Sequence, residues 1–249
     1  MLTIFPVLGL PDISKGDNLG KLIVTKLREA GEEIQRADIV VVSQKIVSKA
    51  EGRIVSLARV RPSPFALEIA READKDPKHV EMILRESKKI IRMKNGHLIT
   101  ETRHGFVCAN AGIDMSNVGR HSDTVTLLPQ DPDKSAASIR SNIRQLTGQD
   151  VPVIITDTFG RAWRVGQVNF AIGVSGLRPI RDYRGTRDMY RHVLHVTEIA
   201  VADELASAAE LVMNKADRVP VAVVRGYKAR RGSGTGRDLI RPEESDLFR

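Results

Sequence analysis

Two aspartates lie in segments whose residue types could hold a divalent cation. Asp157 follows the apolar run Val-Ile-Ile-Thr at 153–156, which is the strongest strand pattern in the chain. A carboxylate directly after a buried strand is held rigidly at the edge of a sheet, and Mg²⁺ and Mn²⁺ prefer such oxygen ligands. Thr158 adds a neutral oxygen beside it. The pattern alone fits equally well an aspartate that starts a turn or caps a helix.

Asp114 lies in a second segment of this kind, Asn-Ala-Gly-Ile-Asp-Met-Ser-Asn at 110–117. Its small residues let the backbone approach a ligand closely, and Asp114 and Asn117 supply oxygens in a loop. Taken alone, the segment is more typical of an ordinary loop rich in Asn and Asp. Two segments that each offer an aspartate are what a phosphate-bridging metal site needs. The sequence does not show that the two meet.

Basic side chains gather in three segments, and guanidinium groups bind phosphate and carboxylate through paired hydrogen bonds. Gln44, Lys45 and Lys49 follow a short strand, and Arg161 and Arg164 follow the 153–158 segment. Most surface Lys and Arg side chains are merely solvated. The clustering of these basic residues beside several glycines makes contact with a ligand more favourable. The third segment contains Arg178, Arg181, Arg184, Arg187 and Arg191.

The composition suits a protein with a large core and an anionic partner. The chain has 249 residues, a net charge of +8, 41% apolar residues and 4% aromatic residues. The charge fits nucleotides or phosphorylated coenzymes as well as nucleic acid, and few aromatic side chains are present to stack on single strands. The single cysteine, Cys108, excludes an internal disulfide and a cysteine-cluster metal site. Because smaller anionic partners explain the charge and aromatic residues are few, we consider nucleic acid an unlikely partner.

The hydropathy pattern predicts neither a membrane span nor a secretion signal. No apolar run approaches the roughly 20 residues that cross a bilayer. Pro6, Gly9 and Pro11 break the apolar N-terminal stretch too early for a signal peptide. We expect a cytoplasmic protein without membrane contact.

Strand and helix patterns alternate along the chain, which indicates a mixed α and β protein. Strands are expected at 2–7, 39–43, 97–102, 106–109, 151–156 and 220–224. Helices are expected at 18–30, 65–73, 78–91, between Asp133 and Gly148, and at 193–213.

Residues at the ends of these elements suggest how they start and stop. Asp17 is expected to cap the first helix and Asp133 the fourth, which Gly148 would end. The segment 160–187 is rich in Gly and Arg, and 230–249 is expected to be a mobile tail. No repeat or clear linker appears, so we expect one domain over 1–249, with a division into two intertwined subdomains left open.

Three other patterns carry less weight. The run Gly-Ser-Gly-Thr-Gly at 232–236 lacks the Gly-Lys-Ser/Thr of a phosphate-binding P-loop. His192 and His195 are spaced for a metal pair at the expected start of the last helix, but no third ligand is nearby. Cys108 lies in an apolar strand and is more typical of packing than of a nucleophile.

Seven segments, in their order along the chain, resemble the coenzyme F420-0:L-glutamate ligase family. Each segment alone is weakly informative, but together they span nearly the whole chain and are highly specific. They are Gly-Leu-Pro at 9–11, Ser-Lys-Ala-Glu-Gly-Arg at 48–53, residues 110–117, Ile-Thr-Asp-Thr at 155–158 with Gly-Arg at 160–161, residues 171–176, Val-Ala-Asp-Glu at 201–204 and Val-Val-Arg-Gly at 223–226.

The resemblance implies an amide ligase that depends on GTP and a divalent metal, Mg²⁺ or Mn²⁺, and allows a monovalent cation such as K⁺. It would add L-glutamate to coenzyme F420-0, and a second, γ-linked glutamate to F420-1, through an acyl phosphate. The family fold is α+β, with mixed, largely antiparallel sheets, flanking helices and an intertwined homodimer. The chain looks similar to the ligase half of bacterial two-domain enzymes, without their nitroreductase-like domain, so no flavin reduction is expected.

The family's functional positions can be transferred to this sequence. The catalytic group is Asp114, Asp157 and Arg161. One metal falls on Asp114 and Asp157 and a second on Thr158, with Asp217 as a further candidate ligand. The nucleotide contacts fall on Leu10, Pro11, Asp12, Ile13, Gln44, Lys45, Lys49, Asn117, Met213, Asn214, Lys215 and Ala216.

The sequence departs from the family pattern in three ways. Gln44 and Lys45 replace small hydroxyl residues of archaeal members, and the segment after Met213 is shorter. Lys215 stands where archaeal members have the carboxylate of the second metal, so Asp217 would have to compensate or that site would be weaker. This departure keeps open a metal-dependent enzyme that cleaves phosphate esters or nucleotides on the same scaffold. A basic nucleic-acid-binding protein is the third alternative.

Overall fold

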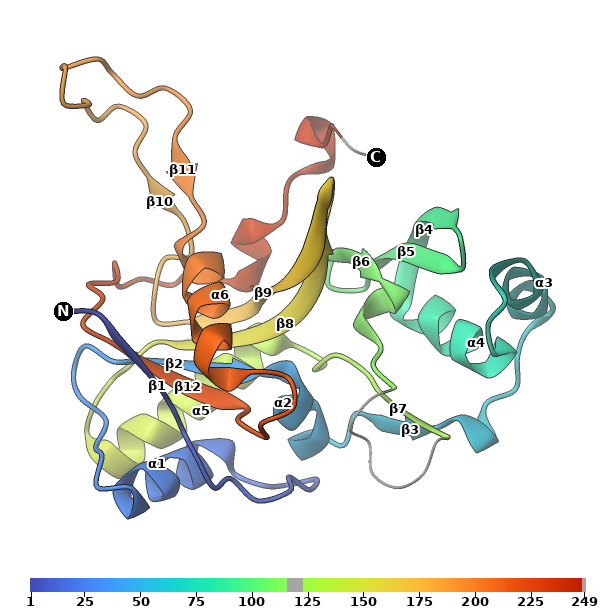
Figure 1. The fold of residues 1–249 in the computed structure, drawn as a ribbon, viewed down its shortest axis with the longest axis horizontal. Coiled ribbons are helices and arrows are strands. Elements are labelled where there is room, and N and C mark those ends of the chain that lie inside the picture. Colours follow the sequence, from blue (N-terminus) through green and yellow to red (C-terminus); the bar gives the residue numbers. More distant parts are fainter. Residues whose placement is uncertain (116–122, 248–249) are drawn as a thin grey trace.

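The computed structural model describes residues 1–115 and 123–247 and shows an α+β protein built around a five-stranded sheet (Figure 1). Of its neighbouring pairs, β2–β8 is parallel and the other three are antiparallel. The expected mixed, largely antiparallel sheet is therefore confirmed. In spatial order the strands are β1 (Thr3–Pro6), β12 (Val221–Arg225), β2 (Ile39–Ser43), β8 (Val153–Arg161) and β9 (Arg164–Ser175).

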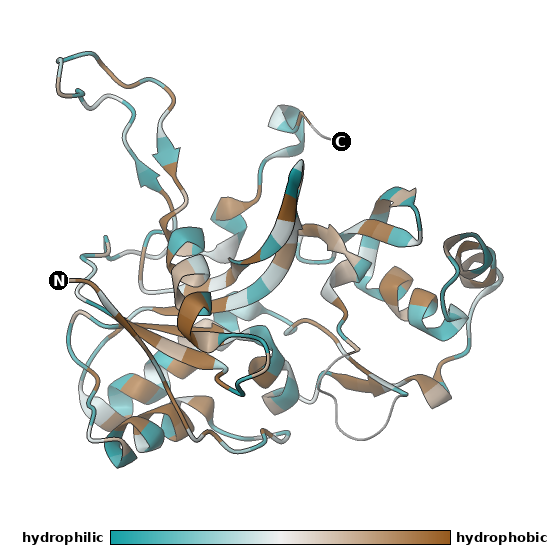
Figure 2. Ribbon diagram, viewed as in Figure 1, coloured by the Kyte–Doolittle hydropathy of each residue, from teal (hydrophilic) through white to brown (hydrophobic). Residues whose placement is uncertain are grey.

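Helices cover both faces of this sheet. Val40 and Val42 of β2 pack with α1 (Leu19–Glu29) and α5 (Pro132–Thr147), whereas Ile39 and Val41 pack with α6 (Val201–Met213). Successive side chains of a strand point to opposite faces, so β2 is apolar from Ile39 to Val42. Each such side chain contributes about 1.5–3 kcal/mol when it is fully buried. The hydrophobic strands in the middle of the sheet are visible in Figure 2.

The helix caps differ from the expectation by one or two residues. Asn18, not Asp17, caps α1, because its side chain accepts a hydrogen bond from the Lys21 amide at 2.9 Å. Asp131, not Asp133, caps α5, since Pro132 takes the first helical position. Gly148 ends α5 in a left-handed conformation with φ 73°, as expected.

The chain between β2 and β8 begins with α2 (Gln44–Ala50) and continues into a smaller unit with its own core, which includes Ile83, Leu98 and Val125. The antiparallel pair β3 (Ile54–Ser56) and β7 (Thr124–Thr126) connects this unit to the main sheet. The other elements of this part are η1 (Leu57–Arg59), α3 (Pro64–Ala73), α4 (Pro77–Glu86), β4 (Ser87–Lys94), β5 (His97–Thr102), β6 (Val107–Ala109) and η2 (Asn110–Gly112).

The helix expected at 78–91 ends at Glu86, and residues 87–94 form β4 instead. The cause is the two-residue turn at Asn95 and Gly96, whose φ angles are 50° and 73°. Asn-Gly favours this hairpin turn, so β4 pairs with β5 and the chain leaves the helix early. The expected pair of strands at 97–102 and 106–109 is confirmed as β5 and β6.

The helix expected at 193–213 begins only at Val201. The residues before it belong to an arm formed by β10 (Arg181–Asp182), β11 (Glu198–Ile199) and the chain between them, which projects from the body (Figure 1). His192 and His195 therefore lie in the arm and not on a helix. Among the described residues, no helix is both long and apolar enough to cross a membrane.

The strand expected at 151–156 continues through Asp157 to Arg161, and the Gly/Arg-rich stretch contains its antiparallel partner β9. Asp157 therefore lies within a strand and not after one. Sequence reasoning missed β9 because its first third, Arg164–Gln167, is exposed and mostly polar, without the alternation that predicts a strand.

Two carboxylates and the described part of the C-terminal tail lie against β9, the edge strand of the sheet. Asp203 accepts a hydrogen bond from the Ala171 amide, and Asp133 accepts one from the Val174 amide, both at 2.8 Å. Asp133 also accepts from the amide of Gly236 at 2.7 Å, at the start of η3 (Gly236–Leu239). A second short helix, η4 (Glu243–Ser245), follows. The tail thus has a defined attachment point, and its expected mobility stays a prediction.

Gly236→Ala should destabilise the protein by about 1–3 kcal/mol, the typical cost of inserting atoms into a well-packed region. A Cβ atom at this position would lie 2.4 Å from the Ile172 carbonyl oxygen. Chemical denaturation measures the free energy of unfolding. Gly160→Ala is the matched control, since a Cβ there would meet nothing within 4 Å. Equal stability of the two variants would contradict the close packing of the tail on β9.

Candidate active site

Asp157 and Thr158 lie on β8 just beyond the point where its pairing with β2 ends. The last parallel pair joins Ser43 to Thr156, and from Asp157 onward β8 pairs with β9 alone. Burial raises the pKa of Asp157 to about 6; the backbone amide of Thr158 opposes this rise, and the nearby Asp114 carboxylate adds to it. Nearby positive charge favours the ionised form of a half-buried carboxylate that lies beside a second carboxylate.

The structure brings Asp114 close enough to interact electrostatically with Asp157. The backbone of Asp114 is fixed by two hydrogen bonds to Thr126, of 3.0 and 2.8 Å. Just before it, Asn110, Ala111 and Gly112 have φ angles of 52°, 54° and 69°. Left-handed conformations are costly for residues other than glycine, and such strain gathers at functional sites.

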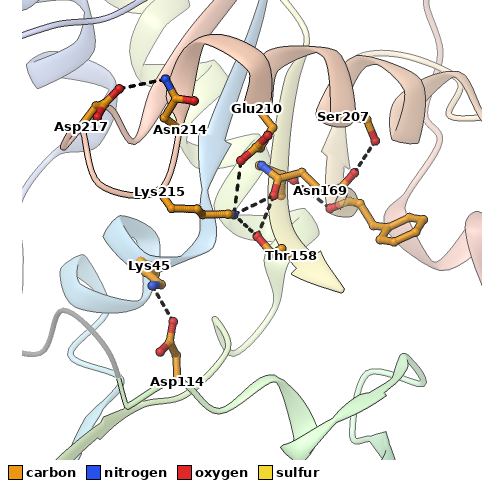
Figure 3. Close-up of polar contacts among 11 residues, drawn as sticks. Lys45, Asp114, Thr158, Asn169, Ser207, Glu210, Asn214, Lys215 and Asp217 are labelled. Atoms are coloured by element: carbon orange, nitrogen blue, oxygen red, sulfur yellow. Dashed lines mark hydrogen bonds and ion pairs between the residues drawn. The ribbon is translucent and has the colours of Figure 1, made fainter. Parts of the chain in front are cut away.

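Two lysines bring positive charge to this pair of aspartates. Lys45 of α2 places its Nζ 2.6 Å from Oδ2 of Asp114. Lys215, from the loop between α6 and β12, donates hydrogen bonds to Oγ1 of Thr158 and to Oδ1 of Asn169, the latter at 3.2 Å (Figure 3). Both ammonium groups act to lower the pKa of Asp157. Burial lowers the pKa of Lys215 itself, against the opposing effect of Glu210.

Asn169 and Glu210 complete the surroundings of Lys215, and sequence reasoning missed both. Thr158 Oγ1 donates to Oδ1 of Asn169 at 2.7 Å, and Oε1 of Glu210 lies 3.9 Å from the Lys215 nitrogen. The sequence offered no clear signal for Asn169, because the strand β9 that buries it was not expected. Asn169 gains meaning only through the register that pairs it with Thr158.

The carboxylates of Asp114 and Asp157 fit a hard divalent cation, because Mg²⁺ commonly binds one or two carboxylates and completes its coordination with water and substrate phosphates. The Thr158 hydroxyl, the expected ligand of a second metal, accepts a hydrogen bond from Lys215. The described residues contain no group of three or more His, Cys, Asp or Glu that could hold a metal without such help. Asp217 is not part of this site: its carboxylate accepts from Asn214 Nδ2 at 2.8 Å and lies away from Thr158 (Figure 3).

Three other candidate residues, Arg161, Ile13 and Met213, make contacts away from the two aspartates. Arg161 holds the hairpin turn, donating from Nη2 to the Val165 carbonyl at 2.7 Å. Its position four residues from Asp157 corresponds to about 13 Å along a strand. Ile13 and Met213 are buried in the two main cores, which assigns their side chains to packing.

Several other expected nucleotide contacts lie on, or are hydrogen-bonded through their segment to, the elements that carry Lys45 and Lys215. The segment with Leu10, Pro11 and Asp12 continues to Gly16, whose amide donates to the Ala50 carbonyl at the end of α2. Gln44 is buried in the first turn of α2, and its Nε2 has no hydrogen-bond partner among the described residues. Lys49 is half-buried on the same helix, Asn214 and Ala216 flank Lys215 in its loop, and Asn117 lies outside the described residues.

Comparison with known proteins identifies the family. A model of the F420-0:gamma-glutamyl ligase family matches residues 8–226. The coenzyme F420:L-glutamate ligase of Methanothermobacter thermautotrophicus is 49% identical over 251 residues, covering 100% of this chain and 99% of the relative. That of Methanocaldococcus jannaschii is 45% identical over 245 residues, covering 97% and 95%, and that of Methanopyrus kandleri is 45% identical over 242 residues, covering 95% and 93%.

The chain therefore belongs to the F420-0:gamma-glutamyl ligase family. The resemblance noted in the sequence is confirmed at this level. These relatives do not test the expected likeness to the ligase half of bacterial two-domain enzymes, which stays a prediction.

Asp157→Asn should stabilise the metal-free protein at pH 7.5. The pKa of Asp157 rises from an ordinary 3.8 to about 6 on folding. The folded state therefore binds more protons than the unfolded state between these values, and stability falls as pH rises through them. The loss amounts to as much as about 3 kcal/mol once the group is ionised.

The measurement is the free energy of unfolding with EDTA at pH 4 and at pH 7.5. The Asn variant should gain stability over the wild type only at the higher pH, and excess Mg²⁺ should reduce or reverse that gain. Glu244→Gln, on the exposed tail, serves as the control for loss of one carboxylate. A pH-independent difference would contradict the raised pKa of Asp157.

Proposed function

We propose that the protein is an amide ligase that joins L-glutamate to coenzyme F420-0 and then, through a γ-linkage, a second glutamate to F420-1. The observation that carries this proposal is the near full-length similarity to relatives named coenzyme F420:L-glutamate ligase. The arrangement of Asp114, Asp157, Lys45 and Lys215 supports it, because a phosphate-transferring site needs both oxygen ligands and positive charge.

GTP and a divalent cation, Mg²⁺ or Mn²⁺, belong to the same proposal. Asp114 and Asp157 would hold the cation, which when bound neutralises phosphate charge and aligns the phosphate oxygens. Lys45 is anchored on the first turn of α2 and can exchange its partner Asp114 for a phosphate oxygen. The unpartnered Nε2 of Gln44 beside it supplies a buried donor. A requirement for K⁺ stays a prediction.

The proposed reaction has two steps. In the first, a carboxylate oxygen of the acceptor attacks the γ-phosphorus of GTP, the bond from that phosphorus to the bridging oxygen breaks, and GDP leaves. In the second, the amine nitrogen of glutamate attacks the carbonyl carbon of the acyl phosphate. The carbon–oxygen bond to phosphate breaks, inorganic phosphate leaves and the nitrogen loses a proton. The protein contributes chiefly position and electrostatic stabilisation.

Mass spectrometry of the coenzyme tests this function. F420-0 incubated with the protein, GTP, L-glutamate and Mg²⁺ or Mn²⁺ should gain whole glutamate residues. Phosphate release from GTP without glutamate addition would favour the nucleotide-cleaving alternative, for which the charge of Lys215 at the proposed metal site is the argument. Tight, steeply salt-dependent binding to duplex or RNA without turnover would favour the nucleic-acid alternative.

Asp114→Asn and Asp157→Asn should each lower the rate of glutamate addition at least about 100-fold. The reason is that metal stabilisation of transition-state charge is worth several kcal/mol. Asp74→Asn makes the same chemical change at an exposed helix end, in a left-handed conformation that asparagine tolerates. That control should retain the wild-type rate. Full activity of either site variant would remove that aspartate from the proposed metal site.

We further infer that the protein forms a homodimer through the projecting arm and the β8–β9 hairpin. Met189 and Val196 in the arm are 85% and 87% exposed, and Trp163 at the hairpin tip is 79% exposed. Isolated apolar side chains are ordinary on a surface, but projecting segments with several of them mark contact sites. The proposed occupant is a second copy of this chain, because the family resemblance implies an intertwined homodimer.

Sedimentation velocity over a range of concentrations measures this association. The wild-type protein should sediment as a dimer, and the double variant Met189→Asp with Val196→Asp should sediment as a monomer. Leu67→Asp introduces the same charge at an exposed leucine of α3, outside the arm, and should leave the dimer intact. A wild-type monomer at all concentrations would exclude the inferred dimer.

A further inference from the structure

The Lys215 ammonium lies among three oxygen-bearing side chains contributed by three different elements. Thr158 on β8 and Asn169 on β9 accept its hydrogen bonds, and Glu210 on α6 lies 3.9 Å away (Figure 3). A carboxylate, a hydroxyl and an amide oxygen are the ligands that hard metal cations prefer. A lysine nitrogen here holds the place that a metal ion could take.

Two of the three oxygen-bearing side chains, those of Thr158 and Asn169, are held in place without Lys215. The Asn169 side chain accepts from the Thr158 hydroxyl at 2.7 Å, and its backbone carbonyl accepts from Ser207 Oγ at 2.8 Å. Asn169 is 4% exposed, so it has little room to turn elsewhere. The Thr158 and Asn169 oxygens are therefore built into the junction of β8 and β9, against α6.

The loop after α6 directs Lys215 toward this junction and directs the neighbouring carboxylate away from it. Asn214 has a left-handed backbone with φ 51°, and its side-chain amide donates to Asp217 at 2.8 Å. In Figure 3 the Asp217 carboxylate lies on the far side of the loop from Thr158. The loop therefore supplies a positive charge to the junction and no carboxylate.

The charge balance around Asp157 leaves little reason for a second metal ion. The carboxylates of Asp114, Asp157 and Glu210 meet the ammonium groups of Lys45 and Lys215. One divalent cation at the two aspartates would bring the local sum to a net positive charge. A second one beside Thr158 would have to displace Lys215, because two cations cannot share these oxygens.

We propose that the Lys215 ammonium is a built-in cation that occupies the position beside Thr158, Asn169 and Glu210, so that this position takes no metal ion. Two-metal sites that place cations on both sides of a transferred phosphate are widespread. In this chain one of the two positive centres is part of the protein. The inference rests on the proposed function for its catalytic meaning, but its geometry can be tested without turnover.

The test is to count Mn²⁺ ions bound per chain, by electron paramagnetic resonance of free Mn²⁺, in wild-type and variant proteins without nucleotide. Lys215→Glu replaces the ammonium with a fourth oxygen ligand and should bind one more ion per chain than the wild type. Lys215→Met removes the charge at similar length and should bind the additional ion more weakly. Circular dichroism and thermal unfolding verify that each variant is folded.

Arg218→Glu is the matched control, because it makes the same charge change in the same loop. Arg218 is exposed and makes no hydrogen bond or ion pair among the described residues, so its variant should bind as many ions as the wild type. An equal count in wild type and in folded Lys215→Glu would overturn the inference. If the wild-type protein binds no ion and Lys215→Glu binds one, the result supports the inference about Lys215. The same result contradicts the proposed metal site at Asp114 and Asp157.

Discussion

The parallel pairing of β2 with β8 is the constraint on which the candidate site depends. Parallel strands end at the same edge of a sheet, and here Ser43 lies opposite Thr156. The next residues on each strand are therefore neighbours in space, although more than a hundred positions separate them in the sequence. α2 begins at that edge and carries Lys45, while β8 continues and carries Asp157 and Thr158. A parallel pair needs a long connection, and the smaller unit supplies it.

That connection delivers the second aspartate. The chain leaves the main body along β3 and returns along β7, and Asp114 is hydrogen-bonded to Thr126 at the end of that pair. The left-handed run at Asn110–Gly112 turns the chain just before Asp114. Lys215 is contributed by another segment, the loop that follows α6. The site is thus formed where four segments of the chain meet.

Local patterns in the sequence were sufficient to identify β2, the start of β8 and the two aspartates. Each of these is a property of a few adjacent residues, such as the valine run at 40–42. The start of α6 and the strand β9 could not be predicted, because pairing partners, and not local periodicity, decide them. Asn169 and Glu210 escaped notice for the same reason: their neighbours Thr158 and Lys215 are set by register and by a loop. The Asn-Gly turn at 95–96 could have predicted the β4–β5 hairpin in place of the last turns of the expected helix.

The two carboxylates on β9 have a consequence for how copies of the chain can meet. An edge strand normally presents free amides on which a strand from another molecule can pair. Asp203 and Asp133 occupy the amides of Ala171 and Val174, and the backbone at Gly236 lies against the carbonyl of Ile172. This half of the edge is closed to sheet extension. Association into filaments by strand addition is therefore blocked along this half of β9.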